Sequence, residues 1–264
     1  MHITITGNLG SGKSTICRLL NEKFGFEIYS TGKVQRALAA QMGMTTLELN
    51  QLMCSDKKYD KMIDDETARI SRENKDKDII FDSRLAWHFV EHSFKVFVSV
   101  SLEVAAERVM NDQRGTVEQY SSLAEAKKLL SERAATECVR YKDIYNLNYM
   151  DFNNYDLIID STYHTPEKIA EIILKEAKAY EMKPVVATKT LISPRRLLKP
   201  SDITEADYKS LASLIKEYEK LTDSIPVVVQ VKKDAENYTV MEGINHAKAA
   251  FLAETPYVPI EVVQ

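Results

Sequence analysis

The sequence predicts an α/β protein with a parallel sheet that is covered by helices on both faces. Three observations support this fold class. Short β-branched runs alternate with amphipathic stretches over the first 180 of the 264 residues. A glycine-rich turn at residues 7–14 joins the first such run to the first amphipathic stretch. The composition changes near Lys183 and Pro184, and the residues after them are expected to form a small α+β unit.

The first unit is expected to contain a parallel five-stranded sheet. Its strands are predicted at residues 2–6, 26–29, 78–82, 95–100 and 155–160. Helices are predicted between and after them at residues 15–24, 33–42, 45–52, 56–70, 102–111, 124–145 and 166–177. In such a sheet, ligands bind beyond the carboxyl ends of the strands, so polar residues at these ends are candidates for one shared site.

The tail is predicted to be a separate domain. Strands are expected at residues 185–188, 225–231, 237–241 and 257–263, and residues 234–236 form a hairpin turn. One helix is expected from Thr204 to Tyr218 and another at 244–253, while residues 193–196 form a charged turn. We therefore expect two domains, residues 1–180 and residues 185–264.

The composition excludes several classes of protein. The net charge of −4, with 28% charged residues, is unlike that of a general nucleic-acid or membrane-surface binder. No apolar run approaches the ~20 residues that a membrane span needs. The cysteines Cys17, Cys54 and Cys138 are scattered, which favours a reducing compartment over a zinc site. We expect a cytoplasmic protein, and the oligomeric state stays open.

Residues 7–14 match G-x-x-x-x-G-K-[ST], the phosphate-binding P-loop, with a predicted strand before it and a helix after it. Glycines let successive N–H groups face one concavity, and the helix N-terminus adds positive potential. Lys13 is expected to reach the β- and γ-phosphates of ATP and Ser14 to ligate Mg²⁺. The predicted ATP site comprises Gly7, Asn8, Leu9, Gly10, Ser11, Gly12, Lys13, Ser14 and Thr15.

The acceptor of the phosphoryl group is expected at the ends of the second and third strands. Ser30 and Gly32 follow the second strand, and Asp82 and Arg84 follow the third. Arg84, together with Arg36 on the next helix, suits an anionic acceptor, because the planar guanidinium matches phosphate. Asp82 is a candidate for holding Mg²⁺ through water or for accepting a bond from an acceptor hydroxyl. The alternatives are solvated surface arginines and a helix-capping aspartate.

A charged segment surrounds Gly115. Arg108 and Arg114 precede it, and Arg133 and Arg140 follow it. A lid that brings arginines onto the transferred phosphate is one interpretation of this pattern. An ordinary solvated helix face is the other.

Residues 1–178 resemble the cytidylate kinases, and especially their short archaeal-type branch. The matching segments are residues 7–14, 30–36, 42–45 with the acidic helices around Asp60 and Asp64, 82–87, 107–108, 132–133, 140–145 and 155–160. The resemblance implies a P-loop NTPase fold and transfer of phosphate from ATP to CMP, so a nucleoside monophosphate is the implied partner. It also implies a set of site residues: Arg36 and Arg84 on the acceptor's phosphate, Ser30 and Asp64 near its nucleoside, and Arg133 and Arg140 on the lid side.

The sequence departs from that branch at residues 82–84, where the family usually has a glutamate and a glycine before the arginine. This departure bears on the acceptor more than on the chemistry. Two alternatives therefore stay open. The first is a P-loop kinase with another small-molecule acceptor. The second is a nucleotide-dependent switch whose tail binds a partner or nucleic acid, although the acidic net charge weighs against nucleic acid.

Residues 188–264 resemble the ParB/sulfiredoxin-like fold, through residues 225–229, 238–243, 245–250 and 258–261. ParB-like domains usually carry arginines after the glycine, whereas this chain has Ile244, Asn245 and His246 there, with Lys248 the one cation. The resemblance implies an accessory or oligomerisation domain that has lost a nucleotide site. Free serine kinases share the fold, so a second small-molecule site is the alternative.

Overall fold

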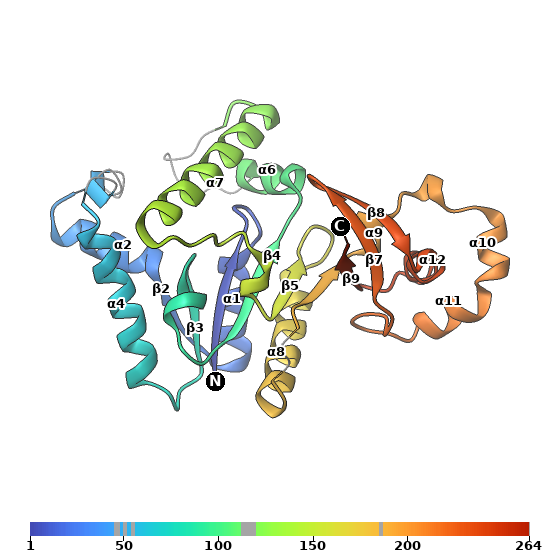
Figure 1. Cartoon of the computed structure of the whole chain (residues 1–264), viewed down its shortest axis with the longest axis horizontal. Helices are drawn as coiled ribbons and strands as arrows, with labels where there is room; N and C mark the ends of the chain where they lie inside the picture. The colour runs from blue at the N-terminus through green and yellow to red at the C-terminus, as the bar shows by residue number, and fades with distance from the viewer. Residues whose placement is uncertain (45–47, 50–51, 54–55, 112–119, 185–186, 264) are drawn as a thin grey trace.

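The computed structural model describes the chain except residues 45–47, 50–51, 54–55, 112–119, 185–186 and 264 and the side chain of Arg36. Within the described residues, nine strands form one continuous sheet in the order β2-β3-β1-β4-β5-β6-β9-β7-β8. Figure 1 shows this sheet running through the molecule, with the tail's strands extending it on the side away from β2. The molecule is therefore built on one sheet that both halves of the chain share.

The first part of the sheet is parallel. In spatial order its strands are β2 (Glu27–Ser30), β3 (Ile79–Asp82), β1 (His2–Gly7), β4 (Phe94–Ser99), β5 (Leu157–Asp160) and β6 (Lys189–Ile192). The strands expected for the first unit are all among them, which confirms the predicted α/β class. The side chains of the central strands β1, β4 and β5 are mostly buried because helices cover both faces, whereas the edge strand β2 is not buried.

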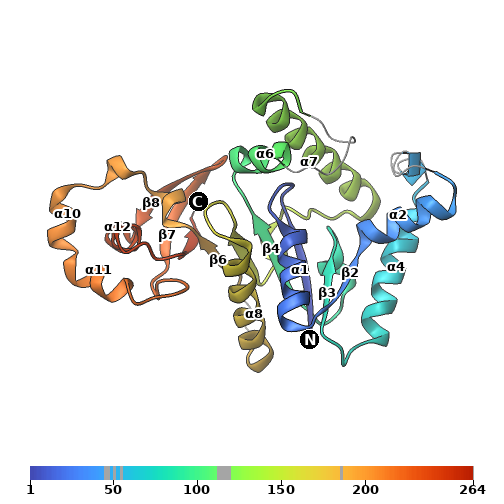
Figure 2. The same cartoon turned by 180° about the vertical axis from the view of Figure 1, so that it is seen from behind.

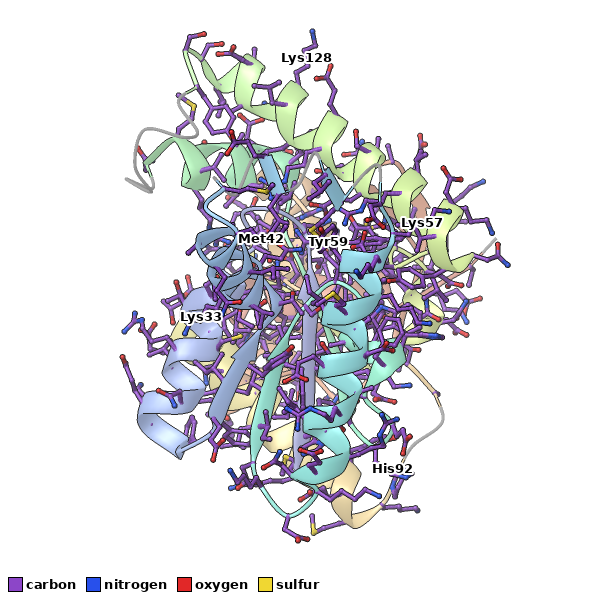
Figure 3. The ribbon with its side chains drawn as sticks, turned by 90° about the vertical axis from the view of Figure 1, so that its left-hand side faces the viewer. Lys33, Met42, Lys57, Tyr59, His92 and Lys128 are labelled. Atoms are coloured by element: carbon purple, nitrogen blue, oxygen red, sulfur yellow. The ribbon has the colours of Figure 1, made fainter. Side chains whose placement is uncertain are left out.

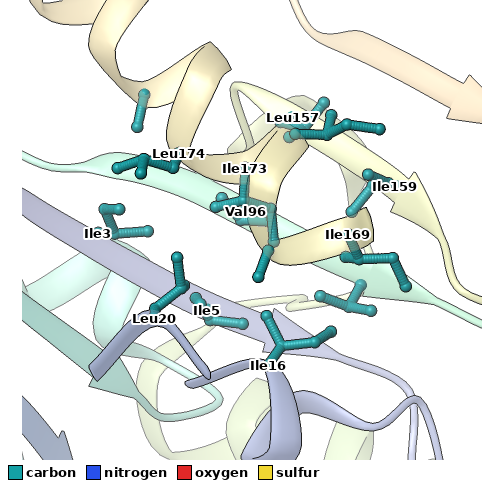
Figure 4. Packing of buried hydrophobic residues seen from close by; sticks show 14 of the residues in the cluster. Ile3, Ile5, Ile16, Leu20, Val96, Leu157, Ile159, Ile169, Ile173 and Leu174 are labelled. Atoms are coloured by element: carbon teal, nitrogen blue, oxygen red, sulfur yellow. The ribbon is translucent and has the colours of Figure 1, made fainter. Parts of the chain in front are cut away.

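Helices α1 (Lys13–Phe24) and α8 (Pro166–Met182) pack side by side on one face, as Figure 2 shows. Between them and the strands lies a core of aliphatic side chains, including Ile5, Leu20, Val96 and Ile173 (Figure 4). The apolar spacing within α1 and α8 places these side chains on one face of each helix. This core fixes where the turn between β1 and α1 stands.

The other helices of this half surround the carboxyl ends of the strands and the β2 edge. They are α2 (Thr31–Gln41), α4 (Lys58–Glu73), α5 (Ala86–Phe89), α6 (Leu102–Asn111) and α7 (Leu123–Tyr145), and a 3₁₀ turn, Phe152–Asn154, precedes β5. Aromatic residues near α5 and α7 pack on the face of the sheet opposite α1, against Phe97 and Ile158. The short helix α5 was not predicted.

The tail continues the sheet with mixed directions. β9 (Val258–Val262) is antiparallel to β6, β7 (Val229–Asp234) is parallel to β9, and β8 (Asn237–Glu242) forms a hairpin with β7. The tail's remaining elements are α9 (Pro194–Leu197), the 3₁₀ turn Pro200–Asp202, α10 (Glu205–Ser210), α11 (Ala212–Tyr218) and α12 (Ile244–Leu252). They enclose a second apolar core.

The two halves are joined by more than the sheet. Leu191 and Tyr257, both from the tail, belong to the core beneath α1 and α8. The buried Tyr257 hydroxyl also donates a hydrogen bond to the Asp160 carbonyl at the end of β5 (2.9 Å). Tail and first half therefore share a hydrophobic core.

Several predictions for the tail need correction. The strand expected at 185–188 begins only at Lys189, and residues 185–186 lie outside the described residues. The strand expected from Ile225 starts at Val229, because Pro226 has no N–H for a ladder. The helix expected to run to Tyr218 is interrupted at Leu211 (φ −103°, ψ 7°). The charged turn is the helix α9, with Pro194 at its first position.

The first half follows the predicted elements within a few residues. Thr45 and Thr46, which were expected to open a helix, and Arg114 lie outside the described residues. Among the helices that the structure describes, none is long and apolar enough to cross a membrane.

Candidate active site

The turn between β1 and α1 is held against the end of β4. The Asn8 N–H donates to the Val98 carbonyl (3.1 Å), and Asn8 Oδ1 accepts from the Val100 N–H (3.2 Å). A Cβ on Gly7 would lie 2.2 Å from the Val98 carbonyl oxygen, so only glycine fits there. The P-loop's shape is thus set by backbone contacts with a buried strand.

The helix that follows offers an anion site. Gly12 (φ 82°) is the N-cap of α1 and has no side chain to satisfy the first N–H groups. Within the described residues, the buried hydroxyl of Ser11 has no hydrogen-bond partner. Ser14 lies exposed in the first turn of α1, followed by Thr15. An orphaned hydroxyl beside a helix N-terminus fits a phosphate ligand.

Lys13 folds back over the loop. Its Nζ donates to the carbonyls of Gly7 and Asn8, both at 3.3 Å. Burial and the positive charge of Arg84 lower the pKa of Lys13 to about 7, while the negative charge of Asp82 works against that shift. Phosphate oxygens would be a stronger partner for the ammonium than two neutral carbonyls.

Arg84 reaches the same loop from the end of β3. Its Nη1 donates to the Gly7 carbonyl (2.7 Å), and its Nε donates to Glu137 Oε2 on α7 (2.9 Å). The two side chains are only 16% and 19% exposed. Burial raises the pKa of Glu137, but the charges of Arg84 and Arg133 outweigh it and the net pKa is lowered. Arg84 therefore links the P-loop, β3 and α7.

Helix α7 also binds α4 through two polar contacts. Arg140 forms an ion pair with Asp60, and the Tyr145 hydroxyl donates to Asp64 Oδ2. Burial raises the pKa of Asp64 to about 6, although the Tyr145 hydroxyl opposes the shift. Figure 3 views this end of the molecule, with α2 and α4 in front and α7 above them; Met42 and Tyr59 lie close together there and pack on one apolar cluster.

The other predicted acceptor residues lie at the same edge of the sheet. Ser30 ends β2, is the N-cap of α2, and is the register partner of Asp82 on β3. Gly32 lies in the first turn of α2. Arg36 lies on the same helix, but its side chain is outside what the structure describes.

Of the arginines predicted for a lid, Arg108 lies on α6, whereas Arg133 and Arg140 lie on α7. Arg133 is 51% exposed and pairs with Glu137 one turn along α7 (3.4 Å). Arg108 lies on α6, where its Nη2 donates to the Ser161 carbonyl (2.6 Å) and its Nη1 approaches the Gly10 carbonyl (3.4 Å). Leu9 packs against the apolar side of α6.

Sequence reasoning gave no site role to three residues that organise this site: Glu137, Asp60 and Tyr145. A signal for Glu137 was present, since residues 133, 137 and 140 lie on one helix face at spacings of four and three. Nothing in the sequence around Glu137 indicates that its partner is Arg84, which is 53 positions away.

Residues 2–163 match the model of the cytidylate kinase-like family. The chain belongs to this family. Two curated relatives are named cytidylate kinase. The one from Methanobrevibacter smithii is 33% identical over 178 residues, covering 67% of this chain and 99% of that protein. The one from Natronomonas pharaonis is 35% identical over 182 residues, covering 68% of this chain and 91% of that protein.

This member of the cytidylate kinase-like family is longer than those relatives. They align over nearly their whole length yet leave about a third of this chain uncovered. Among solved structures, shikimate kinase from Aquifex aeolicus overlaps with a TM-score of 0.43 at 19% identity, covering 69% of this chain and 99% of that one.

Proposed function

We propose that the protein transfers the γ-phosphoryl group of ATP to CMP or dCMP. One observation carries the proposal: Lys13 of the P-loop and Arg84, which follows β3, both donate to the Gly7 carbonyl. Lys13, which is expected to bind the phosphates of ATP, and Arg84, which is expected to bind the phosphate of the acceptor, therefore lie next to each other. The names of the curated relatives support cytidine nucleotides as the acceptor class.

The reaction needs positioning and charge neutralisation more than a base. An oxygen of the acceptor's phosphate attacks Pγ, the bond from Pγ to the β–γ bridging oxygen breaks, and ADP leaves with that electron pair. In this proposal Lys13 and Arg84 neutralise the charge on the transferred group. Arg133 and Arg140 contribute from α7. They lie on the same face of that helix as Glu137, the partner of Arg84.

ATP would lie on residues 7–15, with Mg²⁺ held by Ser14 and, through water, by Asp82. Among the described residues no group of three or more His, Cys, Asp or Glu side chains could hold a metal. One hydroxyl and one carboxylate suit Mg²⁺, which keeps several waters and binds mainly through substrate phosphates. When bound, the metal draws charge from the β- and γ-phosphates.

The acceptor would occupy the space at the ends of β2 and β3, beneath α7. We assign its phosphate to Arg36 and Arg84 and its nucleoside to Ser30, Gly32 and Asp64. Asp64 supports this assignment because it lies where α4 meets α7, with a pKa near 6.

For the tail we propose a ParB/sulfiredoxin-like domain over residues 185–264 with an accessory role, next to a kinase domain over residues 1–180. The cytoplasm, as the compartment, and the absence of nucleic-acid binding belong to the same proposal. The acidic net charge of −4 supports the absence of nucleic-acid binding.

The test is ADP release with MgATP and a panel of CMP, dCMP, UMP, AMP, GMP and free serine. We expect turnover with CMP or dCMP and its loss in Lys13→Ala. Lys23→Ala is the matched control, because Lys23 is an exposed lysine in the last turn of the same helix. Turnover that survives Lys13→Ala, or preference for another acceptor, would contradict the proposal.

A further inference from the structure

The β7–β8 hairpin of the tail reaches across to the first half of the chain. Its turn lies against the beginning of α6 in both views of the molecule (Figures 1 and 2). There Glu236 Oε2 accepts a hydrogen bond from the Leu102 N–H (2.8 Å), between residues 134 positions apart. Leu102 is the first residue of α6, so the tail supplies a carboxylate to that helix's N-terminus.

A partly buried arginine holds the hairpin in this position. Arg196 is 13% exposed, and its Nη2 donates to the Glu236 carbonyl (3.0 Å). Its Nη1 donates to Thr162 Oγ1 (3.0 Å), which in turn accepts from the Ser101 N–H (3.0 Å). Two successive N–H groups at the start of α6 are thus satisfied, one by the loop after β5 and one by the tail.

Helix α6 in turn contacts the P-loop. A Cβ on Gly10 would lie 2.8 Å from the Ala105 carbonyl oxygen, so the loop and the helix touch without spare room. Arg108, one turn further along, extends toward the Gly10 carbonyl and bonds Ser161. A displacement of α6 therefore moves groups that contact the phosphate-binding loop.

We propose that Glu236 is a positioning residue for the ATP site. By holding the N-terminus of α6, the tail keeps Ala105 and Arg108 in place against Gly10. In the sheet, the acceptor side formed by β2 and β3 lies on one side of β1 and its P-loop, and the hairpin lies on the other. The inference rests on the proposed function only in taking ATP as the ligand of the P-loop.

The test measures ATP binding without an acceptor. The dissociation constant of the full-length protein for the magnesium complex of a non-hydrolysable ATP analogue is determined by calorimetry. Because Glu236 is exposed, we expect a modest effect, a ~2–5-fold weaker affinity in Glu236→Ala. Glu236→Gln, which keeps the acceptor oxygen and loses the charge, should fall between this variant and the wild type. Glu242→Ala, an exposed carboxylate on the same hairpin, should leave the affinity unchanged.

The KM values for ATP and for CMP distinguish a positioning role of Glu236 from a general destabilisation of the protein. In Glu236→Ala the KM for ATP should rise by the same factor, while the KM for CMP stays within the error of the wild type. An unchanged affinity for the analogue, an equal change in Glu242→Ala, or equal rises in both KM values would overturn the inference. If the wild type binds the analogue but does not phosphorylate CMP, only the proposed function fails. The ratio of the dissociation constants of Glu236→Ala and the wild type for the analogue then still tests the role of Glu236. If it does not bind the analogue, both fail.

Discussion

The lowered pKa of Lys13 makes ATP binding sensitive to pH. In the free protein the ammonium loses its proton as the pH rises through about 7, because burial and Arg84 disfavour its charge. Phosphate oxygens stabilise the charged form, so the bound state keeps the proton. Binding must therefore take up a proton from solution above this pH, and affinity must fall as the pH rises.

The size of the effect follows from the pKa. With a pKa of about 7, the charged fraction of Lys13 in the free protein is ~90% at pH 6 and ~10% at pH 8. If only the charged form binds well, the dissociation constant for MgATP rises about tenfold over these two pH units, which is ~1.4 kcal/mol. A lysine with an ordinary pKa would give no change over this range.

Calorimetry tests this with a non-hydrolysable ATP analogue and excess Mg²⁺ at pH 6, 7 and 8. Runs in two buffers of different ionisation enthalpy report the protons taken up, and we expect nearly one per site at pH 8. Lys13→Arg is the control, since a guanidinium stays charged and should show weaker but pH-independent binding. Equal dissociation constants at pH 6 and 8, with no proton uptake, would refute the reasoning.

Three further outcomes follow from single contacts. Glu137→Ala leaves the Arg84 guanidinium largely buried without its carboxylate, and urea unfolding should show a loss of about 3 kcal/mol, the low end of the range for a buried pair because both side chains are partly exposed; a loss near zero would mean the pair is not formed. Ala235→Gly relieves the positive φ of 50° at the hairpin turn and should raise the unfolding free energy by ~0.5–1 kcal/mol by the same assay; an unchanged or lower value would contradict strain at this turn. Tyr145→Phe removes the hydroxyl that opposes the effect of burial on Asp64, so carboxyl NMR should find the Asp64 pKa above 6, and an unchanged or lower value would contradict this contact.

The tail shows where a reading of the sequence has limits. A change in composition near Lys183 predicted where the tail begins, but it did not predict that β6 and β9 extend the sheet of the first half or that Tyr257 enters its core. Pairing between β6 and β9 joins residues about 70 positions apart in the chain, from Thr190 to Ile260. Each strand has a normal local pattern, and nothing local states which strand it will pair with.

The sequence by itself determined the P-loop, the α/β class and the strands of the first half, because these depend on a contiguous motif and on local periodicity. Only the tertiary structure decided what surrounds the loop. Arg84 bonds Gly7 across 77 positions, Glu137 across 53, and Glu236 reaches Leu102 across 134. Such contacts leave no periodic trace in the chain, since their geometry is set by how whole helices and strands pack on one another.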